Sequence, residues 1–245
     1  MRIVASARIK IRLVFALILV AIFSVLTAGT KYVIEKSTVN ASAQSTTFTV
    51  IIDAGHGGVD GGTSAQDGTL EKDINLQIAH KLNNILQSFG IETVMTRSED
   101  VSIHDNSAET IRQKKISDLK NRLNIINNTD NAIYVSIHQN HYSDSKYSGA
   151  QVFYSKNNPN SELLAQKIRT PIVSYLQKLN TREIKQSGNE IYLLNNAEVP
   201  AVMVECGFMS NQNETELLKN EKYQRKLTFT IAVGIIDFIN SSEEL

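Results

Sequence analysis

The sequence has a single cysteine, only three prolines, no tryptophan and no excess of either charge over its 245 residues. One cysteine excludes an intrachain disulfide, so the hydrophobic core alone must hold the fold. With 25 basic and 25 acidic residues, no electrostatic attraction to nucleic acid is expected. The scarcity of proline and the lack of a low-complexity tract predict that most of the chain is ordered. Roughly 200 residues follow the N-terminal region, enough for one domain with a sizeable core.

The N-terminal region contains the longest uncharged run of the chain. Residues 13–30 have no charged side chain, and residues 1–12 supply a basic flank of Arg2, Arg8, Lys10 and Arg12. Eighteen residues at about 1.5 Å each nearly cross a hydrocarbon core of roughly 30 Å. The basic flank predicts a cytoplasmic N-terminus and an exported remainder. We therefore expect residues 13–30 to be a membrane anchor or a cleaved signal segment, residues 31–46 a linker, and residues 47–245 the folded domain.

Strand-like and helix-like segments alternate along that domain. Apolar and β-branched runs predict strands at residues 47–52, 91–95, 132–137, 150–154, 190–194 and 201–204. Apolar residues three and four positions apart predict helices at residues 70–89, 116–128, 161–179, 213–220 and 223–239, with a break at Pro171. Residues 98–115 read as a polar loop with some helix. This order predicts an α/β fold, a largely parallel twisted sheet with helices on both faces.

Several metal-competent residues follow the predicted strands. The first, third and last strands of the domain run into His56, His138 and Glu205, and Glu71 opens the helix after the first strand. In open α/β sheets, functional sites gather at the carboxyl ends of the strands, so these residues should lie close together. Two imidazoles and a carboxylate suffice for a catalytic zinc, and a further carboxylate could move the proton of a water.

Each candidate also has a simpler explanation. His56 lies in a glycine-rich loop that lacks the lysine of a phosphate-binding loop, and it could be an ordinary loop histidine. Glu71 could serve only the electrostatics of a helix N-terminus. His138 could be a half-buried strand residue, with His141 as a competing ligand. Glu205 has the least ordinary setting, because a carboxylate ending a buried strand costs several kcal/mol unless it is paired or functional.

Four further polar residues have less specific predictions. Asn140 is placed to orient a ligand or a substrate carbonyl. Arg97 and Arg122 are predicted to pair with nearby acids, with binding of a substrate carboxylate as the alternative. Cys206 lacks the surroundings of a catalytic cysteine and is expected to be a buried thiol. The remaining histidines, His80 and His104, are expected at the surface.

Taken together, these segments resemble the zinc-dependent N-acetylmuramoyl-L-alanine amidases of the amidase-3 family. The matching motifs are residues 51–58, 70–75, 96–97, 122–127, 136–140 and 200–211, within a region of about residues 47–240. The resemblance implies a six-stranded α/β sheet flanked by helices. It also implies that His56, Glu71 and His138 hold one Zn²⁺ ion and that Glu205 is the catalytic acid/base.

Within the family, the chain most resembles the CwlD-type germination-specific amidases of spore-forming bacteria. They share a short chain with an N-terminal hydrophobic segment, and residues 103–122 are also similar. This resemblance implies a peptidoglycan substrate in the spore cortex, from which stem peptides are removed so that muramic lactam can form. A zinc peptidase acting on wall cross-links and a non-catalytic wall-binding module are the alternatives. We expect an extracytoplasmic enzyme, attached to the membrane by its N-terminal helix, with an accessory envelope protein as a possible partner.

Overall fold

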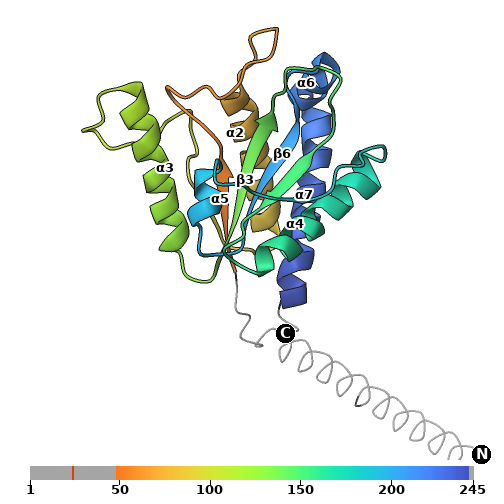
Figure 1. Ribbon diagram of the computed structural model, residues 1–245. Coiled ribbons are helices and arrows are strands. Elements are labelled where there is room, and N and C mark those ends of the chain that lie inside the picture. Colours follow the sequence, from red (N-terminus) through yellow and green to blue (C-terminus); the bar gives the residue numbers. More distant parts are fainter. Residues whose placement is uncertain (1–23, 25–47, 243–245) are drawn as a thin grey trace, which may run out of the picture. The chain divides into compact units, whose positions relative to one another are not determined.

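The computed structural model describes residue 24 and residues 48–242 (Figure 1). Apart from Ser24, the predicted anchor and linker therefore lie outside the described residues. Within the described ranges, no helix combines the length and the apolar character needed to cross a membrane.

A six-stranded sheet in the order β2-β1-β3-β6-β4-β5 forms the centre of the domain. Four strands run parallel to one another, whereas β4 is antiparallel to β6, and β5 is parallel to β4. The predicted α/β fold with a largely parallel sheet is thus confirmed, with two reversed strands at one side. The strands are β1 (Thr49–Ala54), β2 (Thr93–Met95), β3 (Ala132–Asn140), β4 (Gln151–Tyr154), β5 (Lys185–Gln186) and β6 (Ala201–Phe208).

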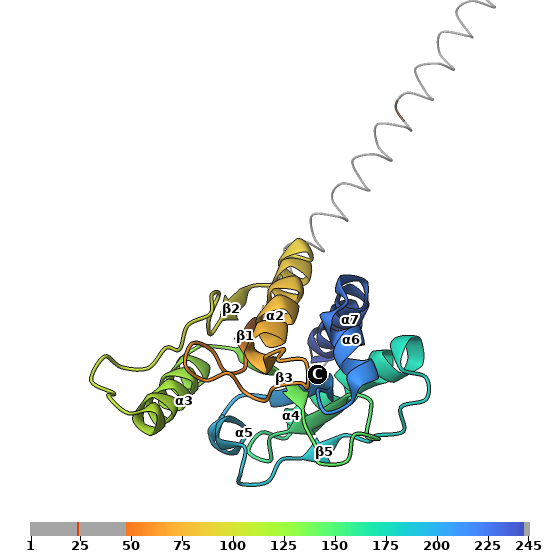
Figure 2. The ribbon, with the colours of Figure 1, turned by 90° about the horizontal axis from the view of Figure 1, so that it is seen from above.

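Helices cover both faces of the sheet, as Figure 2 shows from above. The larger core packs one face against α2, α4 and α7, and the smaller core packs the other against α3 and α5. Neighbouring strand residues alternate between the two cores, so Ile52 joins the larger and Ile51 the smaller. The helices are α2 (Glu71–Ser88), α3 (Ile111–Asn127), α4 (Asn160–Pro171), α5 (Tyr192–Asn196), α6 (Gln212–Lys219) and α7 (Glu221–Ser242).

Burial on both faces explains the continuous apolar strands in the sequence. Val50, Ile51 and Ile52 are fully buried, as are Ile133 and Val135 in β3. Each such side chain contributes about 1.5–3 kcal/mol when it leaves water. The central strands are therefore the most firmly fixed part of the domain, and their carboxyl ends are a rigid platform for a site.

Two element predictions need correction. The predicted strand 190–194 is wrong, because α5 begins at Tyr192 within this segment; a short apolar run does not distinguish strand from helix. The strand that the sequence did not predict is β5, the exposed pair Lys185–Gln186, which has no apolar pattern. Helix α3 begins five residues before the predicted residue 116, at a capping box formed by Thr110 and Gln113.

The predicted break at Pro171 coincides with the end of α4. Beyond it, residues Ile172–Leu176 form one π-helical turn. Proline lacks the N–H that would continue the regular hydrogen bonding, which accounts for the change of helix type here.

Candidate active site

The loop after β1 presents His56 in a left-handed backbone conformation. His56 has φ 63°, which is unfavourable for a residue with a Cβ, so neighbouring contacts must hold it. Arg122 donates from Nη2 to the His56 carbonyl at 2.7 Å. Arg97 donates to the carbonyls of Ala54 and Gly55 at 2.8 and 3.1 Å. Both guanidinium groups are buried and bonded to the protein, which favours their predicted structural role over binding a substrate carboxylate.

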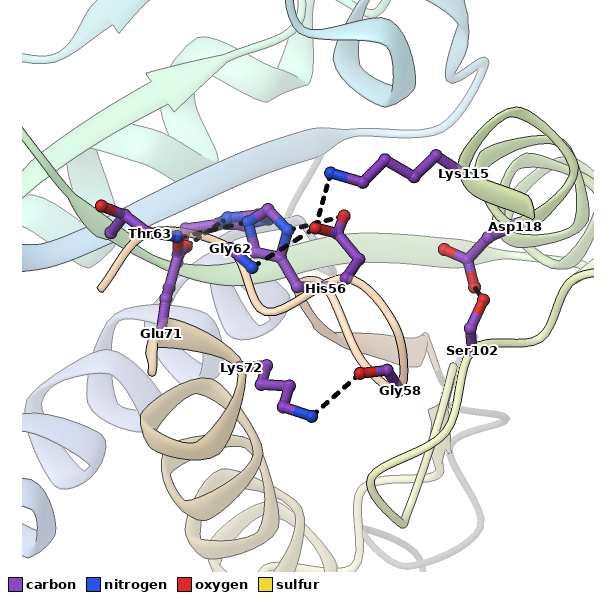
Figure 3. Close-up of polar contacts among 12 residues, drawn as sticks. His56, Gly58, Gly62, Thr63, Glu71, Lys72, Ser102, Lys115 and Asp118 are labelled. Carbon is purple, nitrogen blue, oxygen red and sulfur yellow. Dashed lines mark hydrogen bonds and ion pairs between the residues drawn. The ribbon is translucent and has the colours of Figure 1, made fainter. Parts of the chain in front are cut away.

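The structure brings His56, Glu71 and His138 together around one point. His56 Nε2 lies 3.3 Å from Glu71 Oε2, and His138 Nδ1 lies 2.9 Å from Glu71 Oε1. One donor atom from each residue lies within 4.8 Å of the others. Figure 3 shows the His56 ring and the Glu71 carboxylate meeting above the start of α2. The three candidates, from a loop, a helix and a strand, therefore form a single cluster.

Glu71 is fixed between the two histidines by further donors. Its Oε2 accepts a hydrogen bond from Thr63 N at 2.9 Å, and its Oε1 accepts one from Gln139 N at 3.1 Å. The residue is 4% exposed. Burial alone raises the pKa of Glu71, but the hydrogen bonds and charges of the two histidines outweigh burial and lower it. Glu71 therefore stays ionised and oriented, as a metal-binding carboxylate requires.

Two glycines allow the close packing of this cluster. A Cβ on Gly55 would come within 2.2 Å of His138 Nε2, and one on Gly62 within 2.5 Å of Glu71 Oε2. Gly62 also has φ +69°, a region that side chains rarely adopt. The lack of a side chain at these glycines thus lets the loop backbone pack directly against the His138 and Glu71 side chains, as expected for a loop surrounding a site.

Glu205 lies beside the cluster without belonging to it. It stands opposite His138 in the β3–β6 register, on the same face of the sheet. Its Oε2 is buried and has no hydrogen-bond partner among the described residues. Burial is the main cause that raises the pKa of Glu205 to about 7, with the charge of Glu71 adding to it and the two histidines opposing it. A carboxyl group in this setting is suited to exchange a proton with a bound molecule.

A buried polar network that sequence reasoning missed lies beneath the loop. Asp53, 1% exposed, accepts hydrogen bonds from Thr96, Tyr134 and Ser136 at 2.6–2.7 Å and pairs with Arg122. Because Arg122 also contacts the His56 carbonyl, the network joins β1, β3 and α3 to the cluster. A lone aspartate within an apolar strand was the available signal, since a buried charge needs partners.

The other candidate residues lie outside the cluster. Asn140 ends β3, and its carbonyl accepts a hydrogen bond from Met209 N at 2.8 Å. His141, the competing ligand, is exposed. Cys206 is fully buried, and burial raises the pKa of its thiol, which fits the predicted inert thiol. The two remaining histidines contact nearby residues, His80 the Ser98 carbonyl and His104 the Ser102 hydroxyl.

The donor set fits a zinc ion. Tetrahedral zinc with bonds of about 2.0–2.2 Å requires donor atoms roughly 3.3–3.6 Å apart. One donor atom from each of the three residues lies within 4.8 Å of the others, and the two histidines approach different oxygens of Glu71 at 3.3 and 2.9 Å. The cluster also attracts positive charge. Burial alone lowers the pKa of His56, yet its hydrogen bonds to Asp60 and Glu71 raise it to about 9. A site that keeps a proton at neutral pH is one that a divalent cation can occupy in the proton's place.

Comparisons with known proteins agree with this geometry. Residues 50–237 match the family model Amidase_3, described as N-acetylmuramoyl-L-alanine amidase. The germination-specific N-acetylmuramoyl-L-alanine amidase of Bacillus subtilis is 35% identical over 189 residues, which are 77% of this chain and 78% of that protein.

Solved structures are similar as well. The CwlD amidase from Clostridioides difficile, solved in complex with the GerS lipoprotein, has a TM-score of 0.76 at 42% identity, over 79% of this chain and 99% of that one. An N-acetylmuramoyl-L-alanine amidase from Clostridium difficile 630 has a TM-score of 0.69 at 35% identity, over 79% of this chain and 97% of that one. The chain therefore belongs to the amidase-3 family and is an N-acetylmuramoyl-L-alanine amidase, an enzyme of peptidoglycan.

Proposed function

We propose that this amidase depends on zinc held by His56, Glu71 and His138, and that Glu205 carries the proton. The observation that supports it most is the convergence of two imidazoles and a carboxylate beside a buried carboxylate oxygen that has no partner among the described residues. The bond cleaved is the amide between N-acetylmuramic acid and L-alanine. The products are glycan with free muramic acid and a released stem peptide.

When bound, zinc lowers the pKa of a water from about 15.7 towards roughly 7 and polarises a carbonyl. Glu205 accepts a proton from the attacking water as the water oxygen bonds to the lactyl carbonyl carbon. The carbon–nitrogen bond then breaks, and Glu205 returns the proton to the leaving alanine nitrogen. Glu71, fixed by hydrogen bonds from the Thr63 and Gln139 backbone amides, holds the two histidine rings in position.

Two variants separate the proposed roles. Glu205→Gln should keep about one zinc per chain and lose at least 10²-fold in turnover, because its amide cannot accept the proton. His56→Ala should lose tight zinc binding and turnover together. Glu216→Gln is a matched control, since Glu216 is exposed and its contact is with Lys219. Full activity of Glu205→Gln, or unchanged zinc affinity of His56→Ala, would sink the assignment.

The proposed substrate is spore-cortex peptidoglycan, from which stem peptides are removed as a step towards muramic lactam. It is supported by the similarity to the germination-specific enzyme of Bacillus subtilis. Incubating the zinc-loaded protein with purified cortex and vegetative peptidoglycan, and then resolving the muropeptides, tests this. Release of intact stem peptides is expected; cleavage within stems would support the zinc peptidase instead, and binding without products the non-catalytic module.

We further propose that the enzyme works outside the cytoplasm, with residues 13–30 as a membrane anchor or a cleaved signal. The basic flank and the uncharged run of the sequence support this. An accessory envelope protein is a proposed partner, supported by the similar amidase that was solved with a lipoprotein. Fractionation of cells expressing a C-terminally tagged chain, with N-terminal sequencing, distinguishes anchor from cleaved signal. Recovery of the full-length protein in the cytoplasm would contradict export.

A further inference from the structure

The His56 ring contacts a different carboxylate on each of its two nitrogens. Nε2 faces Glu71 in the cluster, whereas Nδ1 faces outward and lies 3.0 Å from Asp60 Oδ2. The two contacts fix the rotation of the ring, and with it which nitrogen points to the proposed metal. Asp60 itself is not one of the three clustered donors.

Asp60 is in turn fixed by its own loop and by α3. Its backbone exchanges two hydrogen bonds with Gly57, at 2.9 and 3.1 Å, which closes a tight turn directly after His56. Its second carboxylate oxygen, Oδ1, accepts from Gly62 N at 3.3 Å and pairs with Lys115 Nζ at 2.8 Å. Figure 3 shows the Lys115 side chain extending from its helix towards the loop that carries His56. One oxygen is therefore left to the imidazole.

A metal-binding imidazole must offer a lone pair on one nitrogen and carry a proton on the other. A carboxylate facing Nδ1 holds the proton there, so Nε2 keeps its lone pair towards the cluster. His138 is arranged differently. Its Nδ1 faces Glu71, and its Nε2 packs against Gly55, where a Cβ would clash. Both rings contact Glu71; the other side of the His138 ring is held by close packing against Gly55, whereas the second nitrogen of His56 contacts a further carboxylate, Asp60.

We propose that Asp60, held by Lys115, is a positioning residue that orients His56 and keeps its Nε2 free for the metal. This inference rests on the proposed zinc site. In this proposal Asp60 acts on the orientation and protonation of the His56 ring, and not only on the stability of the loop. Asp100 is the comparison residue for loop support alone. Its carboxylate pairs with Lys72 and accepts a hydrogen bond from the backbone N–H of Gly58, in the loop that carries His56, and its described contacts include no histidine.

The first test is the zinc dissociation constant, measured by competition with a chelator on the full-length protein. Asp60→Ala should raise it about 10–100-fold, the usual effect of losing such a carboxylate. Asp60→Asn, which keeps an oxygen able to accept from Nδ1–H, should recover most of that loss. Asp100→Ala should stay within about twofold of the wild type. Unfolding of the metal-free variants in urea shows whether Asp60→Ala remains folded.

The second test observes the protonation of the His56 ring directly. In the zinc-bound wild-type protein, nitrogen-15 NMR should show His56 protonated at Nδ1, with that proton protected from exchange. Asp60→Ala should lose this protection. A metal bound through Nδ1, zinc affinity of folded Asp60→Ala within twofold of the wild type, or an equal loss in Asp100→Ala would each overturn the inference. A wild-type protein that binds no zinc would instead refute the proposed metal site itself.

Discussion

Replacing Asp53 by asparagine tests whether the network beneath the site stabilises the fold through its charge. Asp53→Asn keeps the shape of the side chain and removes the negative charge that faces Arg122. Both residues are almost fully buried, at 1% and 2% exposed. Among the described residues, the substitution therefore leaves the buried guanidinium with Asp118 as its one remaining acidic partner.

The expected loss of stability is about 3 kcal/mol. Removing one partner of a buried ion pair costs roughly 3–5 kcal/mol. Because Arg122 keeps its ion pair with Asp118, the cost here should lie at the lower end of that range. Tyr134 and Ser136 can turn their hydroxyls to accept from the new amide, which limits the further cost. For a domain of this size, about 3 kcal/mol lowers the melting temperature by roughly 6–12 °C.

The effect should also depend on pH in one direction. Burial raises the pKa of Asp53, but Arg122 and three hydroxyl donors outweigh burial and hold it well below the ordinary value of 3.8. A carboxyl group with a lowered pKa stabilises the fold above the pKa of the unfolded chain and loses that contribution as pH falls towards the folded pKa. The gap between wild type and Asp53→Asn should thus be constant above about pH 5 and narrow below about pH 4.

Urea unfolding of the metal-free proteins from pH 3 to pH 7 provides the measurement. Asp144→Asn is the matched control, because Asp144 pairs with Lys146 at the surface, where solvent screens the charges, and the substitution should leave the stability nearly unchanged. A loss under about 1 kcal/mol at pH 7, or an equal gap at pH 3 and pH 7, would refute the reasoning.

Two more substitutions have defined outcomes. Gly55→Ala should lower zinc affinity at least tenfold in chelator competition, because the new Cβ meets His138 Nε2 at 2.2 Å, whereas Gly61→Ala, whose Cβ lies 3.6 Å from Leu70, should not. Equal zinc affinity of the two variants would contradict the packing argument. Thr110→Ala should cost about 0.5–2 kcal/mol in urea unfolding by removing the α3 capping box, and no loss would show that the cap is energetically neutral.

Local patterns predicted most of the elements that position the site. The strongest patterns are the apolar runs of β1, β3 and β6 and the spacing of apolar residues in α2. They are strong because the buried faces of these elements require apolar residues at those positions. The failures are short or polar segments. Residues 190–194 are too short for their pattern to separate strand from helix, and β5 has two exposed residues. The early start of α3 was readable from Thr110 and Gln113, which form a capping box.

The sequence by itself predicted that His56, His138 and Glu205 lie at the carboxyl ends of apolar strands and that Glu71 opens a helix. The structure confirms the start of α2 at Glu71, but β3 and β6 extend past the predicted ends, so His138 and Glu205 lie within them. Parallel pairing of β1, β3 and β6 then makes them neighbours, because such strands end at one edge of the sheet. Only the tertiary structure decided their orientation: the ring nitrogens that face Glu71, the unpartnered oxygen of Glu205, and the contacts of Asp53 and Asp60. These depend on side-chain packing between segments distant in the chain, for example Lys115 of α3 against Asp60, which no local pattern encodes.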